Sequence, residues 1–284
     1  MVRHHTPSLS FEVFPPNPAV GNEKIIQALR EMQDIAPHYI SVTASNNKFN
    51  IEETTVRLAD FIYNDLKIPT IAHLPAVYLT KEMVSDTLCA LDKVGVNKIL
   101  ALRGDIFPDV APKDDFQYAT DLIEYIKEEA PHFDIIGACY LEGHPDSPDR
   151  VSDIRNLKKK VDAGCSSLVT QLFFDNERFY DFQERCTLAG IEVPIHAGIM
   201  PILNRNQALR LLKTCENIKL PRKFRAILDK YEHDTESLRS AGLAYAIDQI
   251  VDLVTQDVAG VHLYTMNNAA TAHHIYQATH TFFS

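Results

Sequence analysis

The chain lacks the signals of several large classes of protein. It has five cysteines among 284 residues, an odd number with no C-x-x-C pair, so a disulfide scaffold is not indicated. No apolar run is long enough to cross a membrane, and no N-terminal segment resembles a signal peptide. These features favour the reducing environment of the cytoplasm, where we expect the protein to work.

Positive charge is also scarce. The chain has 28 Lys and Arg against 38 Asp and Glu, a net charge of −10. Nucleic acids and anionic membranes select basic surfaces, so we expect neither as a partner. The H-E-x-x-H, P-loop, G-x-G-x-x-G and G-x-S-x-G motifs are absent, as is any cysteine-histidine zinc spacing. We therefore expect no bound metal, and a dinucleotide would need a site built from other loops.

The strongest pattern that is present consists of short apolar runs alternating with helix-like segments. The eight runs are 8–14, 39–44, 70–75, 98–104, 134–142, 167–173, 193–201 and 260–267. Strands that alternate with crossover helices form parallel sheets, and eight such units close a barrel. We predict an α/β fold, a single-domain (β/α)8 TIM barrel over residues 1–284. The long interval 204–257, broken at Leu220-Pro221, predicts extra helices before the last strand.

Four joints between a helix and the next strand each carry a glycine. These glycines are Gly95, Gly164, Gly190 and Gly260. Glycine accepts the left-handed backbone conformation that ends a helix, so we predict that conformation at all four.

Glu12 is the best candidate for an acid. Alternation along the first strand places Ser10, Glu12 and Phe14 on one side, and we expect this side to face the barrel interior. Burial would raise the pKa of the Glu12 carboxyl, which suits a proton donor near neutral pH. The alternative is a surface glutamate before a Pro-Pro turn.

Other polar residues follow the strands, where a barrel collects its catalytic groups. Arg103, Gly104 and Asp105 end the fourth run, although a structural ion pair between Arg103 and Asp105 would look the same. One helix carries Asp153, Asn156 and Lys160 at spacings of three and four, a face that could hold a sugar and phosphate or simply meet solvent. Further candidates, each ambiguous alone, are His73, Tyr140, His144 and Gln171.

Six segments taken together resemble one enzyme family. They are SFEVFPP (10–16), LRGD (102–105), NLKKKVDAG (156–164), TQLFFD (170–175), GIMP (198–201) and LYTMN (263–267). In this order, and over nearly the whole chain, they resemble methylenetetrahydrofolate reductases, in the short bacterial form that has only the catalytic domain.

The resemblance implies a flavoprotein that acts by ping-pong hydride transfer. Reduced nicotinamide cofactor, NADH or NADPH, would pass a hydride to FAD, and the reduced flavin would pass it to 5,10-methylenetetrahydrofolate, giving 5-methyltetrahydrofolate. Glu12 matches the acid that opens the folate ring. Asp105 matches a residue between flavin and pterin, and Gln171 and Gln207 match folate contacts. The family also tends to self-associate, so we expect a homo-oligomer.

The resemblance also implies a set of FAD contacts. They are Thr43, His73, Arg103, Gly104, Asp105, Tyr118, Ala119, Tyr140, His144, Asp153, Asn156 and Lys160. Three positions depart from common family patterns. The loop after the second strand lacks a glycine-rich run, Leu211 stands where some relatives have phenylalanine, and Asn268 stands where some have arginine.

Three other functions share parts of this pattern. A flavin-free folate barrel could transfer methyl groups, and a related FAD barrel could oxidise an amino acid such as proline. A binding subunit without activity is the third, but binding alone would not need an acid at Glu12.

Overall fold

Eight parallel strands close into a barrel in the computed structural model of the chain, which describes residues 6–16, 22–44, 51–214 and 218–284. Each strand pairs with its two neighbours in chain order, and β1 pairs with β8 to close the ring. The strands are β1 (Ser8–Val13), β2 (Tyr39–Val42), β3 (Thr70–Pro75), β4 (Lys98–Leu102), β5 (Asp134–Cys139), β6 (Cys165–Thr170), β7 (Ile195–Ile199) and β8 (Gly260–Tyr264). The predicted fold class is confirmed.

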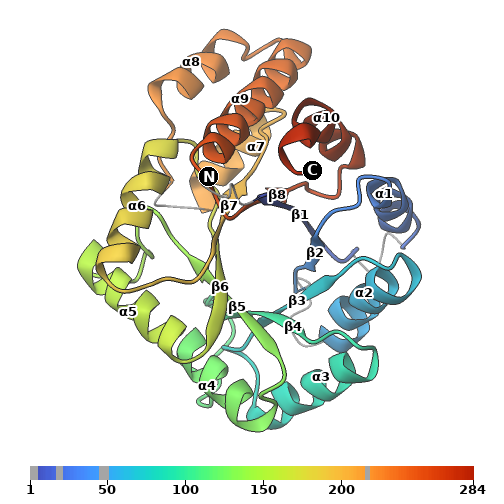
Figure 1. Ribbon diagram of the computed structural model, residues 1–284, viewed down its shortest axis with the longest axis vertical. Helices are drawn as coiled ribbons and strands as arrows, with labels where there is room; N and C mark the ends of the chain where they lie inside the picture. Colours follow the sequence, from blue (N-terminus) through green and yellow to red (C-terminus); the bar gives the residue numbers. More distant parts are fainter. Residues whose placement is uncertain (1–5, 17–21, 45–50, 215–217) are drawn as a thin grey trace, which may run out of the picture.

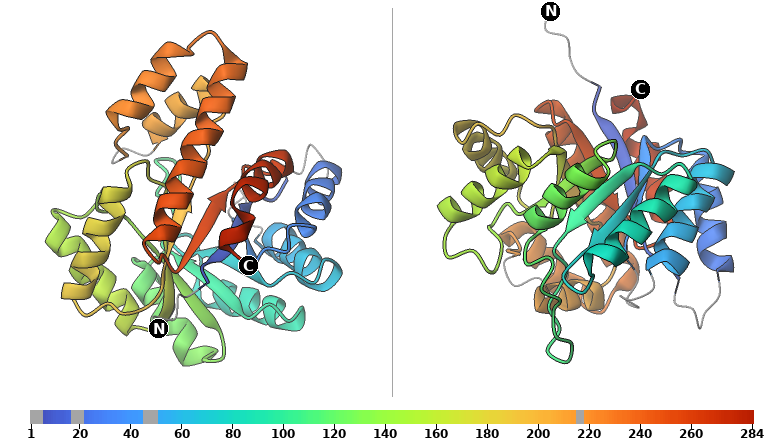
Figure 2. Two further views of the ribbon diagram at one scale, coloured as in Figure 1. Left: turned by 45° about the horizontal axis from the view of Figure 1, so that its top comes forward. Right: turned by 90° about the horizontal axis from the view of Figure 1, so that it is seen from below.

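Helices surround the strands, as the view along the barrel shows (Figure 1). They are α1 (Glu23–Gln33), α2 (Arg57–Asp60), α3 (Lys81–Lys93), α4 (Ala119–Glu129), α5 (Arg150–Asp162), α6 (Asn176–Leu188), α7 (Arg205–Thr214), α8 (Arg222–Lys230), α9 (Thr235–Thr255) and α10 (Ala269–Thr279). Wider π-helical turns flank α2, η1 (Glu52–Val56) and η2 (Phe61–Asp65), and the 3-10 turn η3 (His280–Phe282) follows α10. The extra helices predicted before the last strand are α7, α8 and α9, which extend away from the barrel (Figure 2, left).

Side-chain caps explain where several helices begin. Thr80 accepts a hydrogen bond from the backbone of Met83 at the start of α3, and Asp149 accepts one from Ser152 at the start of α5. Such caps satisfy backbone N–H groups that have no partner within the helix. They fix the points at which the chain leaves the strand ends and turns back along the barrel.

Apolar side chains fill three regions. The largest cluster lies between strands and helices, and a second one lies beneath α7, α8 and α9. The third consists of Ile71, Leu100, Ile136 and Val169, one from each of β3 to β6. Tyr39 of β2 and Leu102 of β4 pack against this cluster. Among the described residues, β1, β7 and β8 contribute none of its members, and His262 of β8 and Ser10 and Glu12 of β1 are buried polar groups.

The strand ends and the glycine joints were predicted only in part. Most predicted runs extend past the observed strands because their last residues belong to the loops; β4, for example, ends before Arg103. Gly95, Gly164 and Gly190 have positive φ angles as predicted. Gly260 is not among them, and the prediction is wrong there. Asp257 takes the positive φ instead, and Gly260 begins β8.

Within the described residues, no helix is both long and apolar enough to cross a bilayer. The segment between β4 and α4 projects beyond the strand ends (Figure 2, right). This segment and the other loops that follow the strands form the mouth of the barrel, where TIM barrels carry their sites.

Candidate functional site

Glu12 lies inside the barrel near the mouth, as its place in the alternating pattern predicts. It is only 8% exposed. Its Oε2 atom lies 3.6 Å from His73 Nε2 and 3.9 Å from His262 Nε2. Burial raises the pKa of Glu12 to about 8, because an ionised carboxylate would lose its hydration there. The carboxyl therefore keeps its proton at neutral pH and can donate it.

His73 faces Glu12 but is not its counter-ion at neutral pH. Burial lowers the pKa of His73 to about 3, so the imidazole is neutral. Its Nε2 atom is buried without a hydrogen-bond partner among the described residues. The contact therefore joins two neutral groups, and the imidazole has a polar atom free to meet a ligand.

Bonds between β1 and the end of β8 hold Glu12 in place. Thr265 Oγ1 donates to the Glu12 carbonyl at 2.9 Å. The Asn267 side chain both accepts from and donates to the backbone of Phe14, at 2.8 and 2.9 Å. These bonds fix the backbone at the acid and two residues after it.

Tyr264 forms the wall beside Glu12 and is fixed by β6 and β7. Its hydroxyl donates to the Thr170 carbonyl at 2.7 Å. A Cβ atom at Gly198 would lie 2.4 Å from that carbonyl and 2.8 Å from the Tyr264 ring. Glycine is therefore needed at position 198 to make room for the tyrosine.

Thr43 follows β2 and supplies a second unpartnered polar atom. Its Oγ1 atom is buried without a hydrogen-bond partner in the described structure, while its backbone N–H donates to the Val13 carbonyl. Buried polar atoms normally have partners. Thr43 and His73 therefore point to a bound ligand that would satisfy both.

Arg103, Gly104 and Asp105 follow β4. The ion pair that the sequence allows between Arg103 and Asp105 does not form among the described residues. Arg103 Nη1 binds Asp146 Oδ2 at 2.6 Å, whereas Asp105 is exposed. Gly104 has φ +92° and a Cβ atom there would lie 2.9 Å from Pro75 Cβ, so other residues would be strained. Arg103 thus offers its charge at the mouth, held by a neighbouring loop.

Tyr140, His144 and Asp153 form one connected group at the end of β5. The rings of Tyr140 and His144 meet edge to face at 4.8 Å. Asp153 is buried on α5, and its carboxylate accepts from His144 N at 3.0 Å and from Ser147 Oγ at 2.9 Å. Burial, followed by the charge of Arg103, lowers the pKa of His144.

The three residues of the predicted polar face of α5 make different contacts. Lys160 Nζ donates to the Ala138 carbonyl at 2.7 Å, and burial lowers its pKa. Asn156, between Asp153 and Lys160 on this face, is exposed. Asp153 holds a loop and Lys160 holds a strand end, so the face is partly structural.

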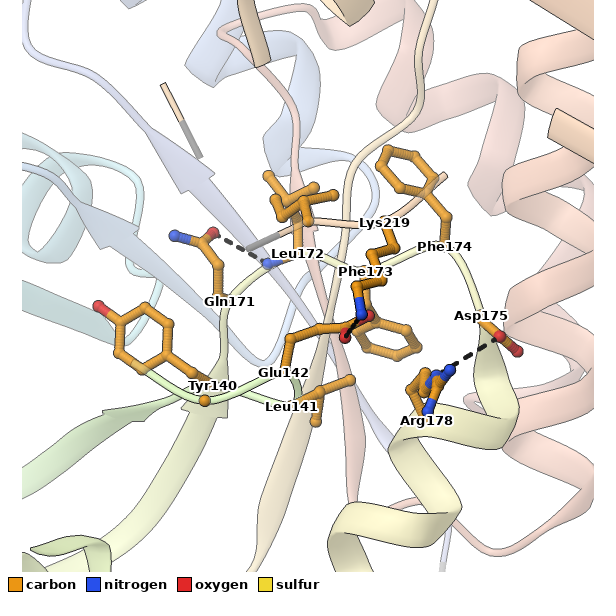
Figure 3. A pocket seen from close by; sticks show the side chains of 12 residues that line it. Tyr140, Leu141, Glu142, Gln171, Leu172, Phe173, Phe174, Asp175, Arg178 and Lys219 are labelled. Carbon is orange, nitrogen blue, oxygen red and sulfur yellow. Dashed lines mark hydrogen bonds and ion pairs between the residues drawn. The ribbon is translucent and has the colours of Figure 1, made fainter. Parts of the chain in front are cut away.

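Gln171 lies just after β6 and lines a pocket with Tyr140. Gln171 Oε1 accepts from the next backbone N–H, and the two side chains point to the same side (Figure 3). Glu142 lies deeper in the pocket wall, 3.7 Å from Arg150 and 4.0 Å from Lys219. The pocket joins loops after β5 and β6 to the segment before α8.

Three further predicted residues, Gln207, Tyr118 and Ala119, lie in or after the loops that follow β4 and β7. Gln207 Oε1 accepts from Leu203 N, and its Nε2 donates to the Pro201 carbonyl, so this amide holds its own loop. Tyr118 is 63% exposed before α4, which begins at Ala119. These residues lie on the rim.

His262 is a further buried residue of the interior that no motif in the sequence marks. It lies on β8 and its ring nitrogens pair with Ser10 and Ser41 at 2.8 and 3.2 Å. Period-two alternation from Gly260 through His262 to Tyr264 was the available signal, since it matches the alternation that places Ser10 and Glu12 inside.

The sequence profile of methylenetetrahydrofolate reductases matches residues 1–280. The chain belongs to this family. It is 32% identical over 268 residues to the 5,10-methylenetetrahydrofolate reductase of Pectobacterium carotovorum, covering 94% of this chain and 88% of that protein. It is 31% identical to the Escherichia coli protein of the same name, covering 94% and 89%.

A plant relative and a solved structure extend the comparison. The Arabidopsis thaliana protein named methylenetetrahydrofolate reductase (NADH) 1 is 31% identical over 92% of this chain and 46% of that protein. A structure from Clostridium thermocellum, described as binding two copies of 5-methyl-5,6,7,8-tetrahydrofolic acid, has a TM-score of 0.70. It covers 99% of this chain and 97% of that chain at 14% identity, and so shows the shared fold only.

The departures from the common patterns of methylenetetrahydrofolate reductases have partial structural explanations. Asn268 caps α10, its side chain accepting from Thr271 N at 3.0 Å. Leu211 is buried in the cluster beneath α7, α8 and α9. The altered part of the loop after β2, residues 45–50, lies outside the described residues.

Proposed function

We propose that this protein reduces 5,10-methylenetetrahydrofolate to 5-methyltetrahydrofolate, using reduced nicotinamide cofactor and bound FAD. Membership of the methylenetetrahydrofolate reductase family supports the reaction. The observation that carries it is Glu12, a carboxyl whose pKa is raised to about 8 by burial at the mouth. Opening the five-membered ring of this folate needs a proton donor that is still protonated at neutral pH.

The residues at the mouth fit a flavin dinucleotide. Thr43 Oγ1 and His73 Nε2 are buried atoms that lack partners in the described structure, and Gly104 permits close approach of a ligand to the backbone. Arg103 and Lys160, which bond Asp146 and the Ala138 carbonyl in this structure, would supply cationic groups for the phosphates. Bound flavin would supply the two-electron chemistry, accepting a hydride from the nicotinamide and giving it to the folate.

The remaining predicted residues lie on α5 and on the loops around the mouth, and each would contact FAD or the folate. Tyr140 and His144 would bound the cofactor, with Asp153 keeping their loop in position. Asn156 would contact the cofactor from α5, and Tyr118 and Ala119 would contact the cofactor from the rim. Gln171 and Asp105 would bind the pterin. Gln207, whose amide is occupied by its own loop, would contribute through the shape of that loop.

NADH and NADPH are both candidates for the electron donor. The Arabidopsis relative carries NADH in its name, which favours NADH. Comparing the rates at which NADH and NADPH reduce the flavin distinguishes the two donors.

The test is an anaerobic absorption experiment on the purified protein. We expect visible flavin bands that bleach with NADH or NADPH and return when methylenetetrahydrofolate is added. A yellow protein bleached by neither donor would reject the nicotinamide assignment. A colourless protein that cannot be reconstituted with FAD would favour the flavin-free folate barrel.

A further inference from the structure

Glu12 must recover a proton after each turnover if the proposed function is correct, and the inference here rests on that function. Reduction of the methylene group adds one hydride to carbon and one proton to the ring nitrogen whose C–N bond breaks. Glu12 gives up that proton and is left as a carboxylate in a buried site. A folate at the mouth would cover its outer side, so the interior of the barrel is the other route of supply.

His262 lies directly beneath Glu12 in that interior. It is 1% exposed, and its Nε2 atom is 3.9 Å from Glu12 Oε2. A movement of about 1 Å by the carboxyl would bring these atoms within hydrogen-bond distance. The Tyr39 ring stacks on the imidazole at 5.5 Å and fixes its plane.

Two serine hydroxyls hold the ring of His262. Ser10 Oγ lies 2.8 Å from Nδ1 and Ser41 Oγ lies 3.2 Å from Nε2. Burial keeps the pKa of His262 well below its usual value, so the ring is neutral and carries one hydrogen. A hydroxyl can donate or accept, so either tautomer satisfies both contacts.

The polar contacts continue towards the N-terminal end of the barrel. Ser10 interacts with Tyr39, whose pKa is raised to about 12 by burial, and Tyr39 meets the ring of His196 edge to face at 6.1 Å. Ser8 Oγ lies 3.2 Å from His196 Nδ1. Ser8, Tyr39 and His196 are each partly exposed, whereas Ser10 and His262 are buried.

Gly260 makes the lower part of this arrangement possible. A Cβ atom there would lie 2.1 Å from Ser8 Oγ and 2.5 Å from His196 Nδ1. Any side chain at this position would displace the serine and the histidine from each other. The position therefore requires glycine for space and not for a left-handed backbone conformation.

We propose that His262, with Ser10 and Ser41, is a proton-relay and positioning group that returns a proton to Glu12 from the N-terminal end of the barrel. In the tautomer with hydrogen on Nε2, His262 gives that hydrogen to the Glu12 carboxylate while Nδ1 takes one from the Ser10 hydroxyl. Ser10 is reprotonated from the Tyr39 side, where solvent supplies the proton. One proton enters and one reaches Glu12, so the charge balances.

The test compares the first turnover with continuous turnover in Ser10→Ala and His262→Gln holoenzymes, because Ser10 and His262 are the two groups that pass the proton. Glu12 begins the first turnover protonated, so reoxidation of the reduced enzyme by methylenetetrahydrofolate should keep the wild-type rate. We expect kcat to fall at least about tenfold, with a burst of one product per site. Added imidazole, a small diffusible acid, should restore part of kcat.

Ser85→Ala is the matched control, since Ser85 Oγ pairs with the Tyr125 hydroxyl between α3 and α4, away from the interior. It should show no burst. Equal slowing of first and later turnovers in both test variants would mean that His262 only shapes the site, and would overturn the proposal. Unchanged kcat in both would overturn it as well.

A second readout does not depend on turnover. Nitrogen NMR of the holoenzyme should show His262 exchanging between its two neutral tautomers, and one fixed tautomer would contradict the relay. If the wild-type enzyme does not reduce methylenetetrahydrofolate, the proposed function itself fails. If the wild-type enzyme reduces methylenetetrahydrofolate and the variants keep the wild-type kcat, the proposed function stands and the relay is wrong.

Discussion

Glu12 and His73 face each other at 3.6 Å across the mouth of the barrel, and both are neutral at neutral pH. An ion pair would need both groups to be ionised in a site that water scarcely reaches. The cost of burying two charges is repaid only when further hydrogen bonds satisfy them. His73 Nε2 has no such bond among the described residues, so burial keeps the proton on the acid.

Replacing Glu12 with glutamine should abolish folate reduction while leaving the flavin chemistry intact. Glutamine keeps the shape of the side chain but cannot donate an acidic proton. We expect the rate of reoxidation by methylenetetrahydrofolate to fall by a factor of about 10² to 10⁴, in line with the loss of a general acid. Stopped-flow absorption measures reoxidation and the preceding reduction by NADH separately.

Reduction by NADH serves as the internal control for Glu12→Gln, because it needs no proton from Glu12. A variant that still reoxidises at the wild-type rate would show that another group is the acid. Loss of both half-reactions together would indicate a damaged flavin site instead.

Glu12 should also make the folded protein less stable as pH rises. Its pKa is raised from 4.5 to about 8, so between these values the folded state holds a proton that the unfolded chain has released. The free energy of unfolding therefore decreases with pH in this window. His73, whose pKa is lowered from 6.5 to about 3, has the opposite effect below pH 6.5.

The effect of Glu12 is therefore clearest above pH 6.5, where His73 no longer contributes. At about 1.4 kcal/mol per pH unit, wild type should lose about 2 kcal/mol between pH 6.5 and 8 relative to Glu12→Gln. Urea denaturation of both proteins across this range measures the difference. Parallel curves for the two proteins would show that the Glu12 carboxyl is not held neutral.

The barrel could be predicted because its signals are local. Each strand run is short and apolar, and each crossover has its own helix. Glu12 could be predicted as an inward residue by alternation alone, since Phe11 and Val13 on the other side lie in the apolar core. The resemblance of six ordered segments then supplied roles that alternation could not.

The interior partners of Glu12 could not be predicted in the same way. His262 meets Ser10 across 252 residues of sequence, and only closure of the barrel brings them together. The requirement for glycine at position 260 could not be predicted for a related reason. Its neighbours Ser8 and His196 come from distant strands, so the sequence shows a helix joint but not the space that the glycine provides.

Lys160 should contribute to FAD binding beyond its structural bond. Lys160→Met keeps the apolar stem and removes the charge that would face a phosphate. Loss of a charge-assisted hydrogen bond predicts FAD binding weakened about tenfold to a hundredfold. Fluorescence titration of the apoprotein with FAD measures the dissociation constant.

Lys159→Met is the matched control for Lys160→Met. Lys159 is the adjacent residue on α5 and is exposed. It should bind FAD as the wild type does. Equal weakening in both variants would mean that only the overall charge of the helix matters, and no weakening in either would remove Lys160 from the proposed site.

Tyr245 should affect folate binding although it lies on α9, outside the barrel. Its hydroxyl donates to the Phe174 carbonyl, and Gln249 on the same helix donates to the Phe173 carbonyl, so α9 holds the loop that follows Gln171. Tyr245→Phe leaves a buried carbonyl without this donor, at a cost of about 1–3 kcal/mol, and loosens the loop. We expect a several-fold higher KM for methylenetetrahydrofolate, measured by steady-state kinetics, and an unchanged rate of reduction by NADH, measured by stopped-flow absorption.

Tyr63→Phe, on η2, is the control and should change neither value. A Tyr245→Phe enzyme with wild-type KM would show that Gln171 does not depend on α9 for its position.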